Sequence, residues 1–292
     1  MWTRLELIAG YWVGRVLGHD GAELQVVHES YLRLPLGGRI GVTDLRGAEE
    51  GLQAAGLAAL RDSRIVPDGR LVQVCGLGEP EACELLLALI LELERPLWLR
   101  TAAGDGQHLR PELLPDGVEN ALATIIDDPE RREAFLLARA RKVDAQERQR
   151  IGELGEIAVV EACRQQLTAA GAEALAADVQ RVSAISDELG YDITAPRRNR
   201  STRRMEVKTT RAAGAIAPVI VTRTEATVGR TDAAWMLVVV RLSNDDAAAI
   251  VGWIGGQQIV PLLPTDQHSD ARWETAMLRF PLAQLTAGLP PC

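Results

Sequence analysis

The stretch Tyr191–Lys208, YDITAPRRNRSTRRMEVK, decides how the second half of this chain folds. Its opening, YDITAP, and the RRMEVKTT that closes and follows it read as two β-strands, and Pro196 ends the first. The arginine-rich segment between them predicts a connecting loop. If the strands pair through this loop, they form an antiparallel hairpin.

Such a hairpin would bring three chemically active side chains together. Glu206 and Lys208 are two residues apart, so a strand places both on one face. Asp192 can then lie beside Glu206 from the preceding strand. Neighbouring carboxylates repel unless a cation lies between them, and Mg²⁺ prefers oxygen ligands. We therefore expect Asp192 and Glu206 to bind a metal and Lys208 to orient or deprotonate a water. A solvated strand face with an ion pair is the alternative.

The use of lysine singles out Lys208. The chain has 30 arginines and only two lysines, Lys142 and Lys208. Where a plain positive charge is enough, this sequence uses arginine. A compact ammonium has a tunable pKa that a guanidinium lacks, so this preference indicates that Lys208 has a chemical role.

A helix is predicted before the hairpin, over GELGEIAVVEACRQQLTAAGA, with Ile157, Val160, Cys163 and Leu167 on one stripe. Glu156 falls on this helix after a glycine that would permit close approach to a sheet. We expect Glu156 to be a catalytic residue that completes the metal shell or anchors the lysine. An exposed helix glutamate is the alternative.

The arginines of the loop form the candidate nucleic-acid contact. Clustered cations next to a metal site suit phosphate binding, although a solvated hairpin would look the same. Arg203 or Arg204 can instead pair with a carboxylate and support the fold. The expected phosphate contacts are Arg197, Arg198, Arg200, Arg203, Arg204 and, after the lysine, Arg211.

Further strands complete the expected second domain, residues 144–292. The segment AWMLVVVRL is almost wholly apolar and predicts a central buried strand. A strand over VQRVSAI, a short helix at Thr224-Glu225, and later strands over AIVGWIGG and TAMLRFPL surround it. The pattern predicts an α/β fold: a restriction-endonuclease-like mixed sheet flanked by helices.

Residues 1–143 predict a smaller α+β module. Residues 1–40 read as short strands and turns, a helix is expected from Thr43, and a hairpin around Pro67-Asp68-Gly69. A strong helix is expected over Glu79–Glu94, and another begins at Pro129. A helix followed by a hairpin suits a winged helix and also unrelated small domains.

The composition indicates the cellular compartment of the protein and limits the kinds of metal site it can form. The longest apolar run, Leu85–Leu91, is too short for a bilayer, and the N-terminus lacks a signal-peptide layout, so we expect a cytoplasmic protein with no membrane partner. The four cysteines and four histidines show no metal-ligand spacing. Residues 1–140 carry 14 arginines against 22 acidic residues. This acidic half favours binding to a protein partner. The sequence also leaves formation of a homodimer as an alternative.

Helix Glu156, then GYD ending in Asp192, then Glu206-Val207-Lys208 resembles the PD-(D/E)XK nuclease pattern, with Tyr191 in place of its usual proline. The order GELGE, YDI, MEVKTT, TRTE and an apolar strand is similar, over residues 148–245, to the family named after the C-terminal domain of the plant protein NO VEIN.

This resemblance implies an endonuclease that uses Mg²⁺, for which Mn²⁺ substitutes, and that acts on nucleic acid, with DNA preferred, in bacterial antiviral defence. A catalytically silent module that binds nucleic acid or a partner protein is the alternative.

Overall fold

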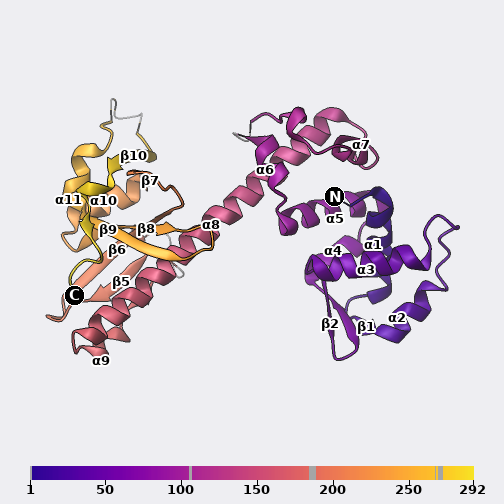
Figure 1. Ribbon diagram of the computed structural model, residues 1–292, viewed down its shortest axis with the longest axis horizontal. Coiled ribbons are helices and arrows are strands. Elements are labelled where there is room, and N and C mark those ends of the chain that lie inside the picture. The colour runs from indigo at the N-terminus through magenta and orange to yellow at the C-terminus, as the bar shows by residue number, and fades with distance from the viewer. Residues whose placement is uncertain (1, 105–106, 184–188, 267, 269–271) are drawn as a thin grey trace. The chain divides into compact units, whose positions relative to one another are not determined.

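The chain divides into two compact units, which Figure 1 shows. The computed structural model describes residues 2–104, 107–183, 189–266, 268 and 272–292. The units are Met1–Gln146 and Glu147–Cys292. Helix α8 (Pro129–Ala169) contributes residues to both. The division expected between residues 143 and 144 therefore lies inside one continuous helix. The sequence had suggested two separate helices in this region.

The first unit opens with the element order of a winged helix. Three helices and three short strands follow in the order α1-β1-α2-α3-β2-β3, and the strands form one antiparallel sheet in the order β1-β3-β2. This topology is the one expected of a winged helix. The elements are α1 (Arg4–Leu17), β1 (Ala22–Glu23), α2 (Leu24–Tyr31), α3 (Val42–Ala54), β2 (Ala58–Arg61) and β3 (Arg64–Pro67).

The prediction of strands and turns over residues 1–40 is wrong for most of this segment. Two helices, α1 and α2, occupy it, whereas β1 and the turn before it match the expectation. Helix α1 begins with a capping box between Thr3 and Glu6, which satisfies free N–H groups of the first turn. A side chain at Gly14 would lie 2.4 Å from the Cys75 sulfur, so this glycine permits close packing of α1.

The predicted hairpin around Pro67-Asp68-Gly69 is displaced. The turn lies at Asp62 and Ser63, whose φ angles of 45° and 64° suit a tight two-residue hairpin. Asp68 instead caps α4 (Gly69–Cys75), where its carboxylate accepts the Arg70 N–H at 2.9 Å. An aspartate followed by glycine favours both a turn and a helix start, so the sequence alone did not separate them.

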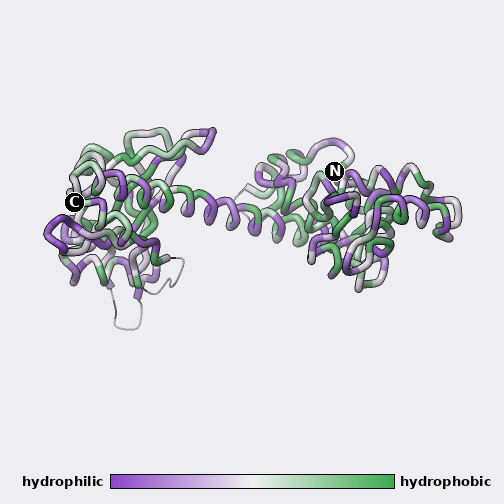
Figure 2. Tube along the Cα trace, turned by 90° about the horizontal axis from the view of Figure 1, so that it is seen from below, coloured by the Kyte–Doolittle hydropathy of each residue, from purple (hydrophilic) through white to green (hydrophobic). Residues whose placement is uncertain are grey.

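Further helices complete the first unit. Helix α5 (Glu79–Glu94) confirms the predicted helix and buries Leu86, Leu87 and Ile90 in the core. Two short helical pieces lie between residues 111 and 127. These elements are α6 (Leu97–Ala103), η1 (Pro111–Leu113), α7 (Val118–Ala123) and the first part of α8. The colouring of Figure 2 shows α8 turning hydrophilic over residues 141–150, RKVDAQERQR.

The second unit is built on a mixed six-stranded sheet of order β11-β9-β8-β6-β5-β4. Strands β6 and β8 are parallel, and the other neighbours are antiparallel. Every residue of strand β8 except Arg241 is buried, which confirms the predicted central strand. The strands are β4 (Gln180–Arg181), β5 (Ile193–Pro196), β6 (Thr202–Thr210), β8 (Trp235–Leu242), β9 (Ala248–Gly255) and β11 (Thr286–Ala287).

Helices cover both faces of this sheet, so the predicted α/β class is confirmed. On one face, Val159, Cys163 and Leu167 of α8 pack against Met205 and the alternate strand residues. On the other lie α10 (Arg223–Thr231), α11 (Gly256–Ile259) and a separate antiparallel pair, β7 (Ile216–Thr222) and β10 (Thr275–Pro281). Short helical segments join these elements: α9 (Glu173–Ala176), η3 (Val260–Leu262) and η4 (Leu282–Gln284).

Two strand predictions need correction. The segment TAMLRFPL is a strand, but it pairs with β7 rather than joining the main sheet. The strand expected over VQRVSAI is limited to β4 in the part that the structure describes, and residues 184–188, including the predicted turn residue Glu188, lie outside the described residues. In the described part of the chain, no helix is both long and apolar enough to cross a bilayer.

Candidate functional site

The hairpin β5–β6 places Asp192 directly opposite Glu206. The ladder pairs Ile193 with Met205, and the Asp192 N–H continues it by donating to the Met205 carbonyl at 2.9 Å. Directly opposed residues of antiparallel strands point to the same face. The Asp192 carboxylate also accepts the Val207 N–H at 2.7 Å. Both carboxylates thus lie on the sheet face away from α8.

Lys208 lies between two carboxylates on this face. Its ammonium is 2.7 Å from Glu206 Oε1 and 3.0 Å from Glu225 Oε2. Glu225 is the third residue of α10 and closes a capping box with Thr222. The predicted catalytic set did not include Glu225. The signal that could have found it is the spacing Thr222-x-x-Glu225 ahead of a helix that follows the lysine strand.

The carboxylates line one cavity of about 480 Å³. Asp192, Glu206 and Glu225 are among its lining residues. Its remaining lining comes from Ser183, the segment Gly190–Tyr191, the start of α10, and Glu274 and Thr275 at β10. Among the described residues, four carboxylates therefore line this cavity.

Burial makes negative charge at this site unfavourable. Removal from water raises the pKa of Glu206 well above its usual value, and the charges of Asp192 and Glu225 raise it further against the lowering effect of Lys208. Burial and the nearby Glu156 and Glu225 raise the pKa of Asp192 to about 6, although the Val207 N–H opposes them. A cation in the cavity would relieve both effects.

Lys208 is held as an ammonium. Burial by itself would lower its pKa, but the charges and hydrogen bonds of Glu206 and Glu225 outweigh that effect and raise it. The two ion pairs fit the orienting role expected for Lys208.

The donor set fits a hard divalent cation with few protein ligands. Among the described residues, no group of three or more His, Cys, Asp or Glu side chains is arranged to hold a metal ion. Mg²⁺ usually takes only one or two carboxylates and keeps several waters for substrate oxygens. Asp192 and Glu206, opposed in one cavity, supply that number.

Glu156 does not complete a three-carboxylate shell. Its Oε2 accepts the Ser183 hydroxyl at 2.6 Å and lies 3.8 Å from the Arg181 guanidinium. Its charge still reaches Asp192, whose pKa it raises. The expected close approach at Gly155 is confirmed: a Cβ there would lie 1.9 Å from Thr209 Oγ1 on β6. This contact brings the helix that carries Glu156 against the sheet.

The five clustered arginines have different environments. Arg203 is fully buried and donates to Gln166 and to the Pro290 carbonyl, each at 2.6 Å. Its assignment to phosphate binding is therefore wrong, because its side chain points into the α8 side of the sheet. Arg204 pairs with Asp232 and lies over the Tyr191 ring. This pairing matches the expectation that one of the two supports the fold.

The remaining three arginines belong to the turn between β5 and β6. Arg197 donates to the Thr202 carbonyl at 3.0 Å, and Arg198 and Arg200 are exposed. The turn begins at Arg197, five residues beyond Asp192, roughly 17 Å along a strand at about 3.4 Å per residue. The turn does not adjoin the carboxylates, contrary to expectation, and could only reach phosphates some nucleotides away.

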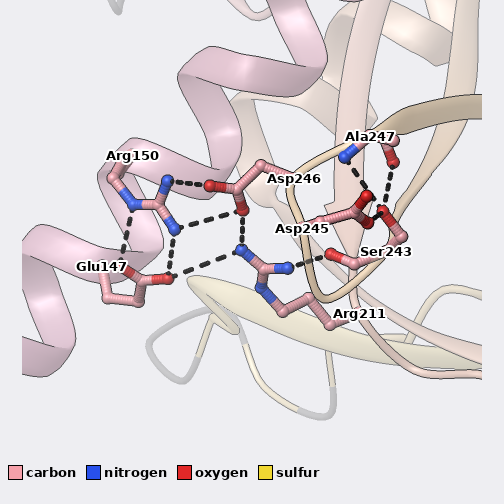
Figure 3. A network of polar contacts seen from close by, with 7 residues as sticks. All are labelled: Glu147, Arg150, Arg211, Ser243, Asp245, Asp246 and Ala247. Carbon is pink, nitrogen blue, oxygen red and sulfur yellow. Dashed lines mark hydrogen bonds and ion pairs between the residues drawn. The ribbon is translucent and has the colours of Figure 1, made fainter.

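Arg211 belongs to a network of ion pairs, drawn in Figure 3. Its guanidinium contacts Asp246 and the Ser243 carbonyl and lies 3.8 Å from Glu147. Arg150 bridges Glu147 and Asp246 at 2.8 and 2.7 Å. The network ties α8 to the end of β6 and to the turn between β8 and β9. Arg211 is therefore engaged with carboxylates of the same unit.

Comparison with curated proteins found no match, and neither did comparison with solved structures. A family model described as "Protein NO VEIN, C-terminal" matches residues 155–251. These bounds lie close to the predicted 148–245. The match confirms the resemblance of this segment to the NO VEIN C-terminal family, and the segment contains Asp192, Glu206, Lys208 and Glu225.

Proposed function

We propose that the second unit is a metal-dependent nuclease of the PD-(D/E)XK type that hydrolyses phosphodiester bonds, with DNA as the preferred substrate. The observation that carries this proposal is the placement of Asp192 and Glu206 on paired strands in one cavity, with the Lys208 ammonium 2.7 Å from Glu206. Two opposed carboxylates in a polar cavity, with a lysine ammonium paired to one of them, suit phosphoryl chemistry.

Each side chain has a role that follows from its contacts. Asp192 and Glu206 would hold Mg²⁺ or Mn²⁺, which supplies Lewis-acid charge to a phosphoryl oxygen when it is bound. Lys208, kept protonated, stabilises negative charge on the phosphate during attack. Glu156 is placed to influence Asp192 through Ser183 and through its charge rather than as a ligand.

The direct test is cleavage by the purified protein. Plasmid, linear duplex, single-stranded DNA and RNA are each incubated with Mg²⁺, Mn²⁺ or EDTA. We expect cleavage with either metal, none with EDTA, and none from Asp192→Asn or Glu206→Gln. Retained nucleic-acid binding without cleavage under every condition would identify the silent binding module instead.

A role in antiviral defence is a further part of this proposal, and it is supported only by the family likeness. Bacteria that express the wild-type chain should plate phage less efficiently than bacteria that express Glu206→Gln. Equal plating by the two strains would argue against defence while leaving the nuclease proposal intact.

A further inference from the structure

The Lys208 ammonium and a divalent cation would compete for the same carboxylate. Lys208 lies 2.7 Å from Glu206 Oε1, one of the two oxygens that Glu206 can offer to a metal. Glu206 is only 4% exposed, so its carboxylate cannot turn easily into solvent. A site that binds a metal through Glu206 therefore needs a second place for the lysine charge.

Glu225 provides that second place, and its position does not depend on Glu206. The Thr222 N–H donates to Glu225 Oε2 at 3.0 Å, and the Glu225 N–H donates to Thr222 Oγ1 at 3.3 Å. These two hydrogen bonds fix the carboxylate at the start of α10. Its Oε2 then lies 3.0 Å from the ammonium, on a different element from Glu206.

We propose that Glu225 is a positioning residue that holds the Lys208 ammonium away from Glu206 so that Glu206 can bind the divalent cation. This inference rests on the proposed function, which it deepens. Without the Glu225 charge, Lys208 pairs with Glu206 alone and acts as an internal competitor of the metal.

The substitution Glu225→Gln isolates this role. The glutamine oxygen still accepts the Thr222 N–H, so the helix start is preserved, while the charge that attracts Lys208 is lost. Glu274→Gln is the matched control, because Glu274 lines the same cavity and no contact between it and Lys208 is seen among the described residues. Thermal unfolding of each variant checks that it is folded.

The first measurement uses metal-free protein with ¹³C-labelled lysine. Because the chain has two lysines, Lys142→Arg assigns both signals. We expect Glu225→Gln to shift the Lys208 side-chain signal and Glu274→Gln to leave it unchanged. An unmoved Lys208 signal in Glu225→Gln would overturn the inference, whatever the protein does with metals or DNA.

The second measurement is Mn²⁺ affinity by calorimetry in a double-mutant cycle with Lys208→Met. We expect Glu225→Gln to weaken Mn²⁺ binding about tenfold when Lys208 is present and to have little effect when it is absent. Equal weakening in both backgrounds would make Glu225 a direct ligand or a general electrostatic contributor, and would overturn the inference.

Two further outcomes can be distinguished from a failure of the inference itself. A wild-type protein that binds no Mn²⁺ contradicts the proposed function and, with it, the need for a positioning residue. If Glu225→Gln does not fold, Glu225→Asp replaces it, since aspartate keeps the charge at a shorter reach. A loss of Mn²⁺ affinity that depends on Lys208 would then support the inference, and one that does not would overturn it.

Discussion

Lys208 is the residue at which sequence and structure agree most usefully. In a chain with 30 arginines, Lys208 is one of two lysines, and the structure places its ammonium between Glu206 and Glu225, at 2.7 and 3.0 Å. A planar guanidinium is longer and forked, so it cannot occupy the same point between two fixed carboxylates.

Lys208→Arg is therefore expected to reduce cleavage by about 100-fold or more, since a misplaced cation no longer faces the charge that develops on the phosphate. The measurement is the single-turnover cleavage rate at saturating Mg²⁺. Lys142→Arg is the control: that lysine is half exposed and pairs with Glu92 in the first unit, and its replacement should leave the rate unchanged. Wild-type cleavage by Lys208→Arg would reduce Lys208 to a general positive charge.

Residue-level reasoning predicted the opposed pair Asp192 and Glu206 from strand spacing alone. It assigned Arg203 to phosphate binding and so missed that this side chain is buried. The signal lies in the alternation: Arg203 shares a face with the core residues Met205 and Val207. A carbonyl of distant Pro290 then satisfies it, and such a partner is invisible in a local pattern.

At the scale of elements, the strands and helices with strong periodicity or clear caps were predictable: α5, β6, β8 and α10. Those that failed depend on distant packing. Helix α1 contains glycines and aromatic residues that favour other structures, and it is stabilised because its glycines fit against α4 and α5. Strands β7 and β10 pair with each other rather than with the main sheet. The local sequence of a strand does not encode which strand it pairs with.

The contact between α8 and β6 can be tested at Gly155. A methyl group there would meet Thr209 Oγ1 at 1.9 Å, so Gly155→Ala should force the helix from the sheet and destabilise the protein by about 1–3 kcal/mol. Gly152→Ala, on the same helix with nothing within 4 Å, should be neutral or stabilising, because alanine favours helix by about 1 kcal/mol. Urea unfolding measures both. Equal stability of the two variants would show that the helix can shift without cost.

The turn between β5 and β6 is the element where phosphate contact is expected. Alanine at Arg197, Arg198 and Arg200 should weaken DNA binding for all sequences alike and flatten its salt dependence by roughly two to three units, at about 0.9 per phosphate contact. The measurement is binding by Glu206→Gln protein across a salt series. Arg230→Ala, an exposed arginine at the end of α10, is the control. An unchanged slope would mean that the turn is only a solvated hairpin.

At the scale of the whole molecule, charge and chemistry are divided between the two units. Residues 1–140 carry 14 arginines against 22 acidic residues, whereas the carboxylate–lysine set lies in Glu147–Cys292. A winged helix with an acidic balance is a poor reader of duplex DNA, because phosphates repel it at long range. We propose that the first unit docks onto a protein partner and supplies targeting rather than chemistry.

Removal of the first unit tests this division. The cut belongs before Glu147, because Glu147 and Arg150 anchor α8 to Asp246 and Arg211 in the second unit, and a later cut would remove that network. Residues 147–292 should then fold, shown by a cooperative thermal transition, and cleave naked DNA in Mg²⁺ within about tenfold of the full chain, since Asp192, Glu206, Lys208 and Glu225 are all retained. Loss of cleavage by a folded truncation would show that the site requires the first unit. Full activity would place the function of the winged helix in the choice of target.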